Sequence, residues 1–249
     1  MNIKSVNQMI SVEGKLSLRN FMGIFFSLFF PSLMLILFGG IYGNEPNEMF
    51  NNHGVLDVSL PAYSVIIICV TGIMNLPLAM ANYRERKVLK RFMATPVSPS
   101  LILFSQVVVN FLLSIAGMII LAAVGKLAYD LKFLGDFWPV AFAFVLSTFA
   151  SFSMGFVIAS VAPNMKSATA IANILYYPML FLTGATVPLE TMPDTMKKIA
   201  DFLPMTHAVK LLKGVWLGEN LGDYMTQIYV LAATLVLGII ISVFTFRWE

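Results

Sequence analysis

The sequence has few charged residues for its length. Only 12% of its 249 residues are Asp, Glu, Lys or Arg, whereas 58% are hydrophobic. An average soluble domain has about 25% charged residues. A chain of this length cannot cover a water-soluble surface with so few polar groups, so the composition predicts an integral membrane protein. The net charge of +3 is small and gives no reason to expect a nucleic-acid partner.

The residues that usually carry chemistry are also scarce. The single cysteine, Cys69, lies in an apolar run and can form no internal disulfide. His53 and His207 stand in separate polar segments without metal-ligand spacing. No Gly-x-x-x-x-Gly-Lys-Ser/Thr phosphate loop is present. We therefore expect no catalytic residues, no metal site and no directly bound cofactor, so that energy for any work must come from another polypeptide.

Six long apolar runs are present, and each approaches the roughly 20 residues that a spanning helix needs. None contains Asp, Glu, Lys, Arg or His. Their absence counts against a proton- or sodium-driven transporter and against an intramembrane hydrolase, although uncharged polar groups could still bind sodium. The predicted fold is all-α and membrane-embedded, a single domain with spans over 21–42, 59–81, 101–125, 138–161, 169–187 and 225–246.

The distribution of positive charge predicts the orientation. With six spans, ten Lys and Arg residues fall on the side of the two termini and six on the other side. Lys and Arg accumulate in cytoplasmic connections. Both termini are therefore predicted to be cytoplasmic, in the plasma membrane of a bacterium. The first 20 residues are too polar for the apolar region of a signal peptide, so the first span is expected to be retained.

Residues 1–20 have the pattern of an amphipathic helix. Ile3, Val6 and Ile10 follow helical spacing between polar residues, and Gly14 is the expected break. We expect this helix to lie on the cytoplasmic face of the membrane. A disordered tail is the alternative.

The segment 188–224 is also amphipathic. One apolar stripe is expected before Pro204 and a second after it, in pieces too short to span. The stripes are Met192, Met196, Ile199 and Leu203, and then Val209, Leu212 and Trp216. Two short helices on the outer side, lying flat or dipping back into the membrane, fit this pattern. An ordinary exposed hairpin is the alternative.

One short stretch, "NYRERKVLKRFMATPVSPS" at 82–100, collects much of the positive charge. It contains Arg84, Arg86, Lys87, Lys90 and Arg91. Good helix formers predict a cytoplasmic helix from Arg84 to Met93, ended by two prolines. An apolar ridge of Val88, Leu89 and Phe92 would suit contact with a soluble protein. Alternatively, the cations only fix the topology and bind anionic lipids.

Three motifs resemble the type-2 ABC exporter permeases, the family of drug, antimicrobial and polysaccharide export. "YRERKVLKRFMATPVSPSLILFSQVVVN" is similar to that family's coupling-helix region, which commonly reads E-R-E-x-G-T-L-E-x-L-x-A-T-P-V-S. "LRNFMGIFFSLFFPSLMLILFG" resembles the start of its first span. "YYPMLFLTGATVPLETMPDTMKKIADFLPMTHAVKLLKGVW" resembles its outer segment. The resemblance covers essentially the whole chain.

The resemblance implies a permease that pairs with a second copy or a homologue, above two cytoplasmic ATPase subunits that bind ATP and Mg. It implies a coupling site containing Arg84, Glu85, Arg86, Lys87, Val88, Leu89, Phe92, Thr95 and Pro96. It also implies re-entrant outer helices before the last span. Their expected gate residues are Pro188, Met192, Pro193, Leu203, Pro204, Thr206, His207 and Leu212. One departure is that Lys87-Val88 replaces the family's usual Gly-Thr.

The resemblance therefore implies export of a hydrophobic or amphipathic compound, such as a drug, an antimicrobial peptide or a lipid-like molecule. Phe25, Phe29 and Phe30 are candidates for lining its path, although phenylalanines in such a run more often face lipid or the core. Membrane lipids are expected partners. The alternative function is a non-transporting immunity, sensor or scaffold subunit.

Overall fold

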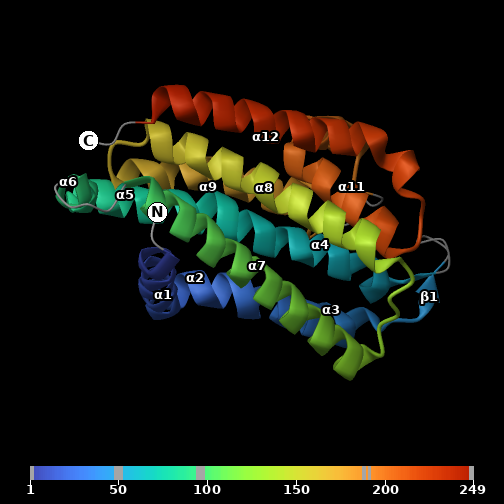
Figure 1. The fold of residues 1–249 in the computed structure, drawn as a ribbon. Helices are drawn as coiled ribbons and strands as arrows, with labels where there is room; N and C mark the ends of the chain where they lie inside the picture. The colour runs from blue at the N-terminus through green and yellow to red at the C-terminus, as the bar shows by residue number, and fades with distance from the viewer. Residues whose placement is uncertain (1–2, 48–52, 94–98, 187–188, 190–191, 247–249) are drawn as a thin grey trace.

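Most helices of the protein run roughly parallel or antiparallel in one bundle, and the N-terminal helix, seen nearly end-on, lies across one end of it (Figure 1). The computed structural model describes residues 3–47, 53–93, 99–186, 189 and 192–246. The one sheet within these residues is a two-stranded antiparallel ladder of β1 (Pro46–Asn47) and β2 (His53–Gly54).

Five helical segments of the described residues are long and apolar enough to cross a membrane. Phe21–Tyr42 comprises α2 (Phe21–Ile24), η1 (Phe25–Phe29) and α3 (Phe30–Tyr42). Val55–Glu85 comprises α4 (Val55–Cys69), η3 (Val70–Asn75) and α5 (Leu76–Glu85). The others are Ser100–Tyr129 within α7 (Pro99–Tyr129), α8 (Phe137–Val161), and Leu221–Thr245, which joins η5 (Leu221–Tyr224) to α12 (Met225–Thr245).

The predicted fifth span corresponds to α9 (Met165–Leu182), which is not among these five. Lys166, Asn173 and Pro178 lower its mean hydropathy. Its 18 residues give a length of about 27 Å at the usual helical rise. The remaining helices are α1 (Ile3–Arg19), α6 (Val88–Met93), α10 (Asp194–Ala200) and α11 (Pro204–Trp216).

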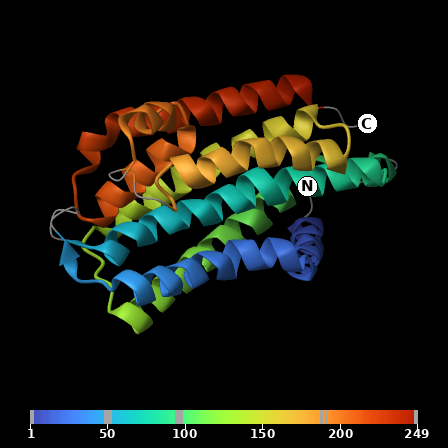
Figure 2. The same ribbon diagram turned by 180° about the vertical axis from the view of Figure 1, so that it is seen from behind.

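Different helices and strands lie at the two ends of the bundle. The ribbon views from both sides place α1, α6 and the last turn of α12 at one end, and β1 at the other (Figures 1 and 2). The α8 helix finishes at the α6 end, whereas α12 starts at the β1 end. The chain between them therefore has to return along the bundle, and α9 makes most of that return.

The long helix Val55–Glu85 is the axis of the bundle. In its most apolar window, 78% of the residues are buried within the protein, against 11% in Leu221–Thr245. The long helix packs against α3, α7, α8, α9 and α11. The last span, by contrast, leaves most of its apolar surface free to face lipid or another protein.

Small residues let the helices approach closely near the middle of this axis. A Cβ atom added to Gly155 of α8 would lie 2.0 Å from the carbonyl oxygen of Gly72 in the π-helical turn η3. The hydroxyl of Ser151 donates to the carbonyl oxygen of Ile68 at 3.0 Å. Such contacts are typical of membrane bundles, where packing rather than water exclusion joins the helices.

The N-terminal helix α1 is continuous from Ile3 to Arg19, so the predicted break at Gly14 is wrong. One glycine costs a helix only about 1 kcal/mol, which packing can offset. The packing partner here is α7.

The predicted apolar stripe around α10 faces the bundle only in part. Met196 and Ile199 are 47% and 51% exposed, whereas Met192 and Ala200 are buried. The stripe on α11 does face the bundle, because Val209, Leu212 and Trp216 are all buried and α11 packs against α4, α8 and α12.

Candidate functional site

The basic stretch forms a helix end and a turn rather than one helix. Arg84 and Glu85 belong to the last turn of the long helix, and α6 begins only at Val88. The predicted continuous helix from Arg84 to Met93 is therefore wrong. Lys87 adopts a left-handed conformation with φ 56°, and its amide donates to the carbonyl oxygen of Arg84 at 2.9 Å. Glycine is the residue that adopts this conformation without strain, which explains the glycine of the resembling motif at this position.

Arg84 binds the carboxyl end of α8. Its Nη1 donates to the carbonyl oxygens of Ala159 at 2.8 Å and Ala162 at 2.5 Å. Its guanidinium carbon also lies 5.4 Å from the ring centroid of Phe246. The last carbonyl groups of a helix lack intrahelical partners and carry partial negative charge, so a cation is favourable there.

Glu85 binds the amino end of the next helix. Its Oε2 accepts a hydrogen bond from the backbone N–H of Met165, the first residue of α9, at 3.0 Å. The side chain of Asn164 caps the same helix by accepting from Ser167 N–H at 2.9 Å. The neighbours Arg84 and Glu85 thus hold both sides of the α8–α9 turn. We call this pair the Arg84–Glu85 clamp.

The remaining residues of the predicted coupling site differ in exposure. Arg86, Lys87, Lys90 and Arg91 are exposed, and Val88 is half-buried. Beside them lies a surface hollow of about 620 Å³, between the turn and the ends of α8 and α12. The side chains of Leu89 and Phe92, and the whole of Thr95 and Pro96, lie outside the described residues.

The described members of the predicted outer gate lie just before α10, between α10 and α11, and in α11. Pro193 is the residue before α10, Leu203 is half-buried, and Pro204 opens α11. Met192 and Leu212 are buried.

Two polar members of this group stabilise the turn between α10 and α11. The buried Thr206 hydroxyl donates to the carbonyl oxygen of Ala200 at 2.6 Å. Nε2 of His207 lies 2.9 Å from the carbonyl oxygen of Asp201, to which it donates. Pro188 lies outside the described residues. Closure of an outer path by this segment stays a prediction.

The predicted path-lining phenylalanines do not share one environment. Phe29 is 53% exposed on the bundle surface, whereas Phe30 is partly buried against the core and Phe25 is half-buried. Phe26, which was not singled out from the sequence, lines a cavity.

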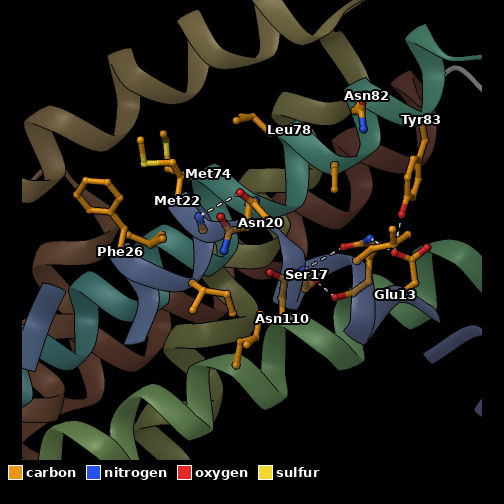
Figure 3. A pocket seen from close by; sticks show the side chains of 18 of the residues that line it. Glu13, Ser17, Asn20, Met22, Phe26, Met74, Leu78, Asn82, Tyr83 and Asn110 are labelled. Atoms are coloured by element: carbon orange, nitrogen blue, oxygen red, sulfur yellow. Dashed lines mark hydrogen bonds between the residues drawn. The ribbon is translucent and has the colours of Figure 1, made fainter. Parts of the chain in front are cut away.

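This cavity, which we call the inner cavity, has a volume of about 600 Å³. It lies between α1, the first span, the long helix and α7. Figure 3 shows it from close by. Glu13 and Tyr83 lie at one end, and Met22, Phe26 and Met74 lie at the other. A polar end and an apolar end therefore share one space.

Glu13 is the unexpected residue of the cavity, because it is only 1% exposed. Its Oε2 accepts from the hydroxyl of Tyr83 at 2.6 Å and from Nε2 of Gln106 at 2.5 Å. Burial raises the pKa of Glu13 above its ordinary value, and these two hydrogen bonds lower it in part. The signal in the sequence was that Glu13 continues the spacing of Ile3, Val6 and Ile10, which puts a carboxylate on the apolar stripe.

Among the described residues, no group of three or more His, Cys, Asp or Glu side chains could hold a metal ion. The five long apolar helical segments of the described residues are those of a multi-pass helical membrane protein. The model of the family described as "ABC-2 type transporter" matches residues 5–217. The chain belongs to this family.

Similar curated proteins include several permeases. The "Putative transport permease ycf38" of Porphyra purpurea is 25% identical over 219 residues, which cover 87% of this chain and 75% of that protein. The "Probable multidrug ABC transporter permease YbhS" of Escherichia coli K12 is 21% identical over 163 residues, 65% of this chain and 43% of that protein. "Nodulation protein J" of Rhizobium leguminosarum bv. viciae is 31% identical over 90 residues, 36% of this chain and 35% of that protein. The chain thus aligns with less than half of the last two.

Proposed function

We propose that this permease belongs to an ATP-driven exporter of a hydrophobic or amphipathic compound, powered by a separate cytoplasmic ATPase subunit that binds ATP and Mg. The family supports the ATPase partner. The name of the similar YbhS, a probable multidrug permease, supports a drug-like cargo. We place the protein in the plasma membrane of a bacterium, with both termini in the cytoplasm.

The Arg84–Glu85 clamp is the observation that carries the proposal. Directly after it the chain presents four exposed cations, on the turn and on α6. A soluble subunit bound there would act on the long helix and, through the two sides of the clamp, on the ends of α8 and α9. One contact would thereby reach three helices.

The path through the membrane requires a sixth crossing, which we assign to α9. The α8 helix finishes at the α6 end of the bundle, whereas α12 starts at the β1 end. A helix of about 27 Å nearly matches the roughly 30 Å hydrocarbon core. This crossing puts α1 and α6 on the same side as both termini, in agreement with the charge bias of the sequence.

A second permease copy or a homologue is the proposed partner within the membrane. Large apolar side chains are exposed along the first span and α12, where lipid tails or another copy would cover them. The clearest cases are Ile36, Leu37, Ile41, Val243 and Phe244. We assign the closing of the outer path to α10 and α11.

The test is purification of the tagged chain from its native membranes, followed by mass spectrometry and ATP hydrolysis measurements in liposomes. We expect an ABC ATPase subunit to co-purify and its hydrolysis to rise with cargo. Phe92→Ala, which leaves the charge unchanged, should weaken the association, whereas Lys87→Arg should be milder. Co-purification without any coupling of hydrolysis to transport would instead indicate the sensor or scaffold function.

A further inference from the structure

The chemistry of the inner cavity points to a particular class of bound molecule. Its volume of about 600 Å³ lies within the roughly 300–1,000 Å³ of small-molecule sites. Amide and hydroxyl groups surround Glu13 at one end, and Met22, Phe26 and Met74 form the walls of the other. A molecule that fills this space needs a polar head and an apolar body.

The charge of the cavity selects the kind of head group. Among the described residues that line it, Glu13 is the one carboxylic acid, and none is Lys, Arg or His. An anionic head would therefore meet a carboxylate with no cation to compensate the repulsion. A cationic head would be attracted to the carboxylate in a place of low dielectric constant, and an ammonium with N–H groups would add a charge-assisted hydrogen bond.

The hydrogen bonds of Glu13 leave one of its oxygens available. Both Tyr83 and Gln106 donate to Oε2. Within the described part of the chain, Oε1 has no hydrogen-bond partner. The amide of Gln106 is held in turn by Nδ2 of Asn110, which donates to Oε1 of Gln106 at 3.2 Å. The polar end of the cavity is therefore fixed in position before any molecule enters.

We propose that the inner cavity binds an amphipathic amine, with its ammonium group against Oε1 of Glu13 and its hydrocarbon part along Met22, Phe26 and Met74. The inference rests on the proposed function, because it makes this cavity the place where cargo enters the permease from the inner side of the membrane.

The test is equilibrium binding of radiolabelled dodecyltrimethylammonium to the protein in phosphatidylglycerol nanodiscs, without ATPase and without ATP. This probe keeps its charge at every pH. We expect saturable binding that is competed by dodecylamine but not by dodecanol or dodecyl sulfate. Glu13→Gln should weaken it at least about tenfold, since the attraction between the carboxylate and the quaternary ammonium is lost while the shape of the side chain is kept.

Two further variants make the result decisive. Asp57→Asn is the matched control, because it also neutralises a buried carboxylate, but at the opposite end of the long helix. It should bind the probe as the wild type does. Ala79→Phe places a ring inside the cavity and should abolish binding, and it decides the matter if Glu13→Gln does not fold. Unchanged binding in Ala79→Phe, or equal binding of the sulfate and the ammonium probe, overturns the inference.

The lipid composition of the nanodisc distinguishes two sources of the amine, a membrane lipid and a free amphiphile. Competition by phosphatidylethanolamine in the nanodisc would identify a membrane lipid as the bound amine, and its absence a free amphiphile. Both results keep the inference. Binding that depends on Glu13 without any ATP-driven transport would refute only the proposed function, whereas transport with binding that ignores Glu13 would refute only this inference.

Discussion

The backbone N–H of Met165 donates to the carboxylate of Glu85 at 3.0 Å, across 80 positions of the chain. A carboxylate at a helix amino end contributes about 0.3–1 kcal/mol to stability when it is exposed, as Glu85 is. We therefore expect Glu85→Ala to lower the melting temperature only slightly. If the clamp transmits movement, the same change should strongly reduce transport per ATP hydrolysed. Glu85→Gln, which keeps an acceptor oxygen, should be milder. A wild-type ratio of transport to hydrolysis in Glu85→Ala would contradict the coupling role.

Lys87 offers a test of the turn before α6. A non-glycine residue in the left-handed region costs about 1–2 kcal/mol, and glycine removes this strain while adding freedom to the unfolded chain. Lys87→Gly should therefore raise the melting temperature of the protein slightly. Lys90→Gly, in the interior of α6, should lower it instead. Thermal unfolding of both variants in one detergent checks the prediction, and the same sign of change in both would argue against the strained turn.

The close approach of Gly155 to Gly72 predicts a severe effect of one methyl group. Gly155→Ala should cost about 1–3 kcal/mol, because α8 and the long helix must separate. Gly40→Ala serves as the control, since an added Cβ at this exposed helical position would meet no atom within 4 Å. The yield of folded protein after gel filtration should drop for the first variant only. Equal yields would mean that the two helices can shift apart easily.

The helix α11 should not tolerate charge on its buried face. Leu212 is 1% exposed, so Leu212→Asp should destabilise the protein by several kcal/mol. Leu203→Asp should have a smaller effect, because Leu203 is half-buried. Ile199→Asp, on the exposed face of α10, is the control. Wild-type export and stability in Leu212→Asp would show that α11 does not need this packing.

The inner cavity should respond to pH through Glu13. Because burial raises its pKa, Glu13 becomes neutral at a higher pH than an ordinary glutamate does. Acidification from pH 7 should thus weaken binding of the ammonium probe before an exposed carboxylate would titrate. The stability of the folded protein should change in the opposite direction. A raised folded-state pKa favours the protonated folded form, so this contribution is complete below the ordinary pKa and is lost as the pH rises through the raised one.

Glu13→Gln should remove both effects. Its neighbours in the cavity do not interfere, because Gln106 does not titrate and tyrosine has an ordinary pKa of about 10. Probe binding and melting temperature measured between pH 4 and 8 would check this. Identical pH profiles for the wild type and Glu13→Gln would show that another group titrates.

The sequence predicted the features that depend on local composition. Apolar runs marked the spans, and the spacing of Val209, Leu212 and Trp216 marked the buried face of α11. The Arg84–Glu85 clamp was not predicted, because a cation and an anion within a basic stretch have the pattern of surface charges. Their partners are backbone groups of α8 and α9, more than 70 residues away. The stripe around α10 is covered only in part, because spacing alone does not show whether a neighbouring element covers a face. Local spacing put Glu13 on the apolar stripe of α1, but its hydrogen bonds to Tyr83 and Gln106 are tertiary contacts that no local pattern contains.

The long helix is also longer than the membrane is thick. Its 31 residues extend about 46 Å, against a hydrocarbon core of about 30 Å. With little tilt, roughly 16 Å of it must lie in the headgroup and water layers. The composition of its last turn, with Asn82, Arg84 and Glu85, puts much of that excess at the α6 end. The end of the long helix that bears the clamp therefore projects beyond the hydrocarbon core. A water-soluble protein can reach the clamp there without entering the bilayer.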